Sequence, residues 1–231
     1  MLLFAVLLGL LPGFAWLVFY LSEDPHPEPK RLIVLTFFVG MAFAFFTAII
    51  ENVFNNGASL VGVQELSILS LLGLAAIEEW MKFAAAHFAV GKSPVLEDPI
   101  DAMIYMIVAA LGFATLENIG AITNVAAAAA SGTLVASVFE TISLRFVGAT
   151  LLHSLASAIV GYHWALGIVK KNVPHYIIVG FIFATLLHAT FNYLILNNAG
   201  IGYPILFLLV VGFFVLNDFE KLKMREGVKL S

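Results

Sequence analysis

The chain has 231 residues, of which 61% are hydrophobic and 11% charged, and its formal net charge is −4. A soluble domain carries about 25% charged residues and needs polar side chains over its surface, so this composition excludes a secreted enzyme, a DNA-binding domain and a disordered protein. It predicts an all-α polytopic membrane protein, and the absence of cysteine excludes disulfides, thiolate nucleophiles and cysteine-ligated metals.

Taken in chain order, seven apolar stretches are long enough to cross a bilayer, which takes about 20 residues in a helix. We predict spans at 1–21, 31–55, 64–90, 99–123, 143–169, 174–197 and 201–218. The Ala-rich segment 125–142 is weak as a span, and we expect an interfacial or re-entrant helix there. The first stretch has neither the basic start nor the cleavage site of a signal peptide, so we expect it to be retained.

The basic residues support this number of spans. With seven spans, nine of them fall on one side of the membrane: Lys30, Arg31, Lys92, Lys170, Lys171, Lys221, Lys223, Arg225 and Lys229. The other side has only Arg145, near a span boundary. Because Lys and Arg are enriched in cytoplasmic loops, we predict a multi-pass protein of the cell membrane with its N-terminus outside and its C-terminus in the cytoplasm.

Several ionisable side chains fall inside the predicted spans, where their cost makes them candidate functional groups. His153 and His188 are equidistant from the turn at Lys170 and Lys171, and therefore lie at one depth in an antiparallel helix pair. Glu79 and Glu117 are nearly equidistant from the preceding turn. We expect one polar layer within the membrane, with Glu51 near its outer mouth. Its members, in chain order, are Glu78, Glu79, Lys82, Glu117, His153, His188 and Asn192.

Two mechanisms fit such a layer. In the first, Glu78 or Glu79 is a general base that activates water, and Lys82 neutralises the other carboxylate. Successive residues of a helix point about 100° apart, so only one of the two glutamates faces the site squarely. The sequence does not distinguish between them.

The remaining polar residues complete either mechanism. Without a metal, Glu117 assists the base, while His188 and Asn192, one helical turn apart, donate hydrogen bonds to an oxyanion. In the alternative, a Zn²⁺ ion with an open coordination position polarises the water. Its candidate ligands are Glu79, Glu117, His153 and His188.

Two non-enzymatic functions compete with hydrolysis. A transporter or proton-relay protein would use the same carboxylates and imidazoles, but it would spread them along the membrane normal. A membrane-embedded binding protein would keep the fold and tolerate glutamine in place of the glutamates. The common depth of the polar residues favours an enzyme.

Three sequence motifs resemble a known family. Glu78–Lys82 matches EExxK, and Phe113–Asn118 matches FxxxEN. With His153 and His188, these motifs resemble the PrsW-type intramembrane proteases over about residues 60–196. That family is related to the CAAX prenyl-protease and bacteriocin-immunity clan, whose final HxxxN pattern His188 and Asn192 reproduce.

The resemblance implies a single transmembrane domain over 1–231, with accessory spans at 1–55 and 201–218 and a basic tail at 219–231. It implies an endopeptidase that cuts membrane proteins in or near a transmembrane segment, for example a single-span protein like an anti-sigma factor. Its functional residues would be Glu78, Glu79, Glu117, His153 and His188. A CAAX-type prenyl-protein protease is the alternative. Because HxxxN is shared with the CAAX enzymes, we favour the metal-free mechanism over zinc.

Overall fold

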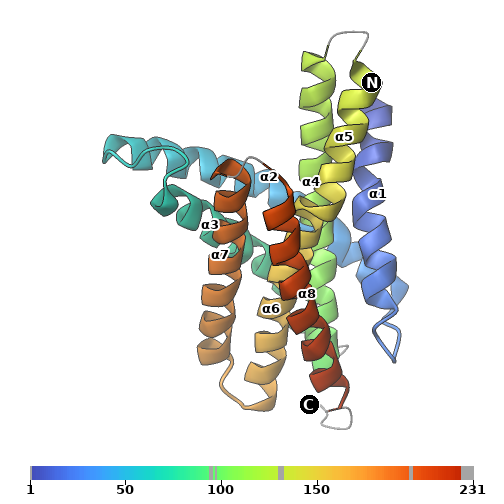
Figure 1. The fold of residues 1–231 in the computed structure, drawn as a ribbon. Helices are drawn as coiled ribbons and strands as arrows, with labels where there is room; N and C mark the ends of the chain where they lie inside the picture. Colours follow the sequence, from blue (N-terminus) through green and yellow to red (C-terminus); the bar gives the residue numbers. More distant parts are fainter. Residues whose placement is uncertain (1, 94–95, 97, 130–132, 198–199, 225–231) are drawn as a thin grey trace.

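The computed structural model describes residues 2–93, 96, 98–129, 133–197 and 200–224, and every regular element in these ranges is an α-helix. Figure 1 shows how the helices are arranged. They are α1 (Leu2–Leu21), α2 (Lys30–Leu60), α3 (Ile68–Val90), α4 (Pro99–Ala128), α5 (Leu134–Val147), α6 (Ala149–Val169), α7 (Val173–Asn197) and α8 (Gly202–Lys223). The predicted all-α class is confirmed.

Helix α4 is the core of the bundle. Every residue from Pro99 to Thr115 is buried, as expected for a helix that is apolar all round, and α4 packs against α1, α2, α3, α5, α6 and α8. Its closest approach is to α2, where Gly112 lies against the Phe37 backbone and Gly40 against that of Ala109. A Cβ atom on either glycine would overlap a carbonyl oxygen of the facing helix, so these positions require glycine.

Among the residues that the structure describes, six helical segments are long and apolar enough to cross a membrane, one fewer than the sequence predicted. The segment without this property is α3, because it carries Glu78, Glu79 and Lys82 within four residues of one another along the chain. In Figure 1, α2 and α3 run obliquely to the other helices. Helix α3 is thus the one that supplies more ionisable groups to the interior than any other described helix.

The prediction for residues 125–142 is wrong in its boundaries. Helix α4 continues to Ala128, because alanine favours helix extension, and a separate helix, α5, begins at Leu134. Helix α5 packs against α4 and α1, and it ends at Gly148. The predicted span 143–169 is therefore divided at Gly148 between the end of α5 and the whole of α6.

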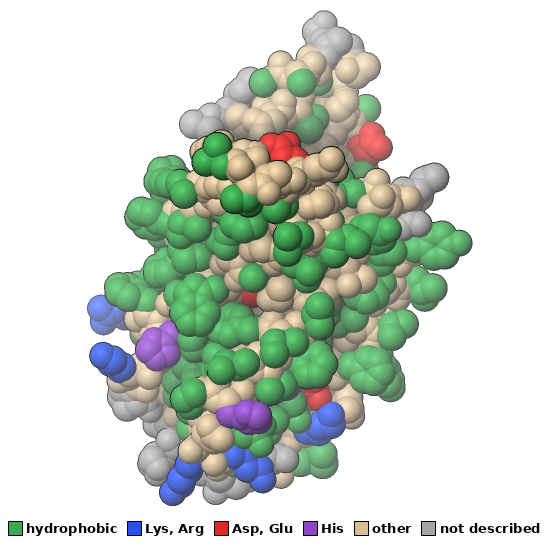
Figure 2. Space-filling model, turned by 90° about the vertical axis from the view of Figure 1, so that its left-hand side faces the viewer, with side chains coloured by type: hydrophobic (Ala, Val, Ile, Leu, Met, Phe, Trp, Pro, Cys, Tyr) green, Lys and Arg blue, Asp and Glu red, His purple; other side chains and the backbone are tan. Residues whose placement is uncertain are grey.

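The basic residues gather at one end of the bundle, as predicted. Lys223 at the end of α8 pairs with Glu23 just after α1 (2.8 Å), and His26 lies 3.3 Å from Asp98 at the start of α4. Figure 2 shows the Lys and Arg side chains in the lower part of one face and apolar side chains above them. Arg225 and Lys229 lie outside the described residues. The orientation of this end in a membrane stays a prediction.

Candidate active site

Helix α3 contributes two carboxylates that share one ammonium group. Lys82 Nζ lies 2.8 Å from Glu79 Oε1 and 3.1 Å from Glu78 Oε2. These spacings of three and four residues place the groups on one side of the helix. Lys82 and Glu79 are completely buried, whereas the Glu78 side chain is 13% exposed. The Lys82 ammonium also lies over the Phe113 ring of α4, 4.8 Å from its centroid.

Helix α7 brings His188 to the same place. Its Nδ1 lies 2.7 Å from Glu79 Oε1, and its Nε2 lies 3.8 Å from Glu78 Oε1. The second oxygen of Glu79 accepts a hydrogen bond from Ser157 Oγ of α6 at 3.5 Å. Glu79 is therefore bound by side chains of three helices, and its position is fixed.

Helix α6 supplies His153 in a parallel arrangement. Its Nε2 lies 3.0 Å from Glu117 Oε2 of α4, and its Nδ1 lies 3.6 Å from Glu78 Oε2. Nδ1 is buried and has no hydrogen-bond partner in the part of the chain that the structure describes. The two imidazole rings are perpendicular, with centroids 5.3 Å apart.

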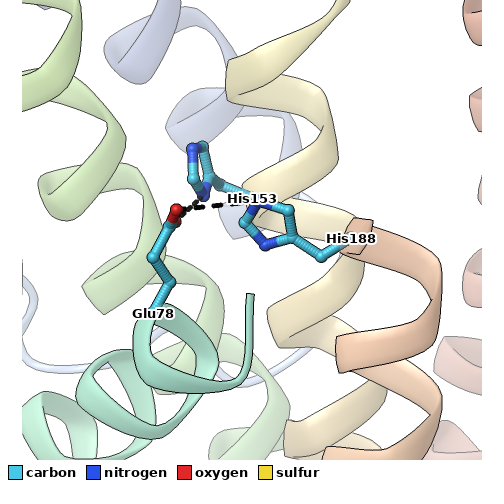
Figure 3. Close-up of side chains that lie close together, drawn as sticks. All are labelled: Glu78, His153 and His188. Carbon is cyan, nitrogen blue, oxygen red and sulfur yellow. Dashed lines mark ion pairs between the residues drawn. The ribbon is translucent and has the colours of Figure 1, made fainter. Parts of the chain in front are cut away.

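Both histidines thus bind a carboxylate through one ring nitrogen and direct the other toward Glu78 (Figure 3). An ionised carboxylate only accepts hydrogen bonds, so the bonded nitrogen carries the proton and the other offers a lone pair when the ring is neutral. Ligand atoms of Glu78, His153 and His188 all lie within 4.8 Å of one another. A carboxylate behind each ligating imidazole is the usual environment of histidine in metal sites.

Arg145, which lies near a predicted span boundary, adds a second cation to the cluster. Arg145 Nη2 of α5 lies 3.0 Å from Glu117 Oε2, and its Nε donates to the side-chain oxygen of the next residue, Asn118. The signal was present in the sequence, since Arg145 is the one basic residue on the side that otherwise lacks them. Its partner was not readable, because that depends on how α5 packs.

The comparison with known proteins decides the family. A model described as "PrsW family intramembrane metalloprotease" matches residues 28–217, which is most of the chain. The chain belongs to the PrsW family. It is therefore an intramembrane protease, and its substrate is a membrane protein.

Individual members of the PrsW family agree with this assignment. Protease PrsW of Geobacillus kaustophilus is 29% identical over 95% of this chain and 91% of its own length. Protease PrsW of Oceanobacillus iheyensis is 25% identical, over 81% of this chain and 80% of its own. Protease PrsW of Bacillus subtilis is 31% identical over 48% of this chain and 50% of its own. No solved structure gives a significant match.

The structure arranges the carboxylates around the histidines differently from the sequence hypothesis for a zinc site. The sequence hypothesis placed Glu79 and Glu117 among the zinc ligands, beside the two histidines. In the structure each of these carboxylates instead binds the far side of one imidazole, and the carboxylate that faces both rings is Glu78. Sequence alone did not distinguish Glu78 from Glu79. The two residues are adjacent, and which side chain faces the histidines depends on how α3 is rotated when it packs.

Two further residues differ in their relation to the cluster. Asn192, one turn beyond His188 on α7, makes no hydrogen bond with the described residues, so its amide is free to donate and the expected role at an oxyanion stays a prediction. Glu51 of α2 lies close enough to Glu78 and Glu117 for electrostatic interaction. Helix α2 therefore belongs to the surroundings of the site, as the sequence indicated for Glu51.

The polar residues at the start of α4 have a structural role. Asp98 precedes α4, Pro99 is its first residue, and the Asp101 carboxylate accepts a hydrogen bond from the Asp98 backbone N–H at 2.8 Å. These three residues form the start of a helix, which is what such a sequence favours. They lie at the basic end of the bundle.

Proposed function

We propose that this PrsW-family protease is a zinc enzyme in which Glu78, His153 and His188 hold the metal. The observation that carries the proposal is the pair of imidazoles whose free nitrogens converge on Glu78 while Glu117 and Glu79 bind their other sides. This departs from the metal-free mechanism that the HxxxN pattern favoured. The reason is that His153 Nδ1 is buried and has no hydrogen-bond partner among the described residues. A buried polar atom without a partner needs an explanation, and a role as a metal ligand supplies one.

The charge of the cluster also fits a dication. Among the described residues that bond within the cluster there are three carboxylates and two side-chain cations, Lys82 and Arg145, so one negative charge is left over. Catalytic zinc takes three protein ligands drawn from imidazoles and carboxylates and leaves one position for water. Glu78 Oε2 binds Lys82, whereas Glu78 Oε1 is available as a ligand atom.

The residues of this chain would divide the work of hydrolysis. Zinc, when bound, lowers the pKa of water and polarises the scissile carbonyl. Glu117 accepts the proton of the attacking water and passes it to the amine nitrogen as the C–N bond breaks. This role suits Glu117 because its side chain is 32% exposed and its Oε1 accepts no hydrogen bond from the described residues. Glu79 and Lys82, by contrast, are sealed from solvent.

We further propose that the cleaved bond lies in or near a transmembrane segment of a single-span protein of the anti-sigma-factor type. An apolar cleft of about 240 Å³ lies between α3 and α7, and it reaches Ala189, the neighbour of His188. A helix of a membrane protein is the kind of ligand that apolar walls of this sort accommodate. With the basic end in the cytoplasm, the N-terminus of the protease would lie outside.

The experiment uses the purified full chain and a tagged single-span substrate. We expect the wild type to bind one equivalent of zinc and to cleave, and Glu78→Gln to lose both properties. Glu65→Gln, which alters an exposed carboxylate in the α2–α3 connection, is the matched control. Full activity in a demonstrably zinc-free sample would leave the metal-free mechanism in place. Cleavage retained in both Glu78→Gln and Glu79→Gln would refute hydrolysis by this cluster.

A further inference from the structure

Arg145 is well placed to act on the proposed zinc ligands without contacting them. It lies in the last turn of α5, three residues before Gly148, at which α5 gives way to α6. Its side chain is 22% exposed, so it is neither sealed like Lys82 nor free in solvent. The cation therefore lies at the edge of the cluster, between α5 and α4.

The guanidinium binds two successive side chains of α4. Nη2 lies 3.0 Å from Glu117 Oε2, and Nε donates to the side-chain oxygen of Asn118. A planar guanidinium presents several donors in a fixed fork, whereas a lysine ammonium is a single point of charge. Arg145 thus sets both the position and the direction of the Glu117 carboxylate.

Asn118 in turn is anchored to two other helices. It is completely buried, and its amide nitrogen donates to Thr150 Oγ1 of α6 at 3.1 Å and to the Gly9 carbonyl of α1 at 3.5 Å. The amide is therefore orientated so that its oxygen faces Arg145. A side chain held this firmly gives the guanidinium a rigid point of attachment, in contrast to a salt bridge between two mobile groups.

The contact between Arg145 and Glu117 also affects His153, a proposed zinc ligand. The same oxygen, Glu117 Oε2, accepts from Arg145 and lies 3.0 Å from His153 Nε2. As long as that oxygen is held, His153 carries its proton on Nε2 and turns its Nδ1 toward Glu78. We propose that Arg145 is a positioning residue that, through Glu117, holds His153 in its ligating orientation; this inference rests on the proposed function.

The test measures zinc binding by the full chain as well as cleavage. In Arg145→Gln we expect the zinc Kd to rise about 10-fold, because removing a group that supports a metal ligand typically weakens binding by 10- to 100-fold. We expect kcat to fall and KM to stay within about twofold of wild type. Arg145→Lys keeps the charge but loses the fork, so it should recover only part of the affinity.

The control is Lys223→Gln, which breaks an ion pair between helix ends far from the site, Lys223 with Glu23. It should leave the zinc Kd and kcat unchanged. A wild-type Kd in either Arg145 variant overturns the inference, and if Arg145→Gln fails to fold, Arg145→Lys decides. A wild type that binds no zinc would instead refute the proposed function, and this inference with it.

Discussion

The site consists of two similar halves that differ in how far their side chains are buried from solvent. In one half, His188 is backed by Glu79, which binds Lys82, and all of this half is sealed from solvent. In the other half, His153 is backed by Glu117, which binds Arg145, and the last two are partly exposed. Each half is an imidazole, a carboxylate and a cation in sequence. We expect the sealed half to contribute more to the stability of the fold, and the half that water reaches to carry the proton transfer.

The largest effect should come from the buried half. Lys82→Met leaves two carboxylates without their cation in a dry interior, and we expect it to lower the free energy of unfolding by about 3–5 kcal/mol. Denaturant-induced unfolding in detergent measures this. Lys221→Met, the same substitution in an exposed pair with Asp218, should cost less than about 1 kcal/mol. Equal stability of the two variants would show that the buried half has no special role in folding.

The exposed half should respond in activity and not in stability. Glu117→Gln keeps the shape of the side chain but removes the proton acceptor, and we expect kcat to fall by about 100-fold or more. Single-turnover cleavage of the tagged substrate gives this value, and unfolding of the same sample should remain close to wild type. A variant that cleaves normally would move the general base elsewhere in the cluster, with Glu51 the next carboxylate to test.

A smaller effect is expected from Ser157, whose hydroxyl binds Glu79 in the buried half. Ser157→Ala removes the hydrogen bond to Glu79 Oε2, which at 3.5 Å is long. We expect a loss of stability of about 1 kcal/mol and a few-fold change in zinc affinity, since Glu79 keeps its bonds to Lys82 and His188. Thermal unfolding with and without zinc separates the two contributions. A loss as large as that of Lys82→Met would contradict this ranking.

The smallest effect concerns Asn192. In the proposed zinc mechanism the metal would polarise the scissile carbonyl and Asn192 would have no part in this, so Asn192→Ala should change kcat less than about twofold. Steady-state cleavage rates are sufficient to detect more. A large drop in kcat with unchanged KM would restore the oxyanion role that the HxxxN pattern suggested, and it would make α7 contribute to both halves of the mechanism.

Much of the site was predictable because it depends on helix spacing. Counting from the turns placed Glu79, Glu117, His153 and His188 at one depth, and the structure brings all four together. The rotation of a packed helix about its axis was not predictable, so the sequence could not show that Glu78, and not Glu79, faces both imidazoles. Arg145 was missed for a related reason, since its partner depends on the break at Gly148, and the composition of residues 125–148 gave no sign of where the chain would turn.

The enclosure of α4 limits how a substrate can arrive. Since Pro99 to Thr115 are buried, this part of α4 offers no open flank to a protein that diffuses in the bilayer. Any path beside it would require α1, α2 or α6 to part from tightly fitted glycine contacts or from the main body of the core. We expect a substrate to approach instead along the apolar cleft between α3 and α7, which is lined by Leu71, Ala189 and Tyr193 among others and borders the helices that carry Glu78 and His188. A segment bound in that cleft would reach the polar cluster from the side, while the enclosed central helix keeps its packing.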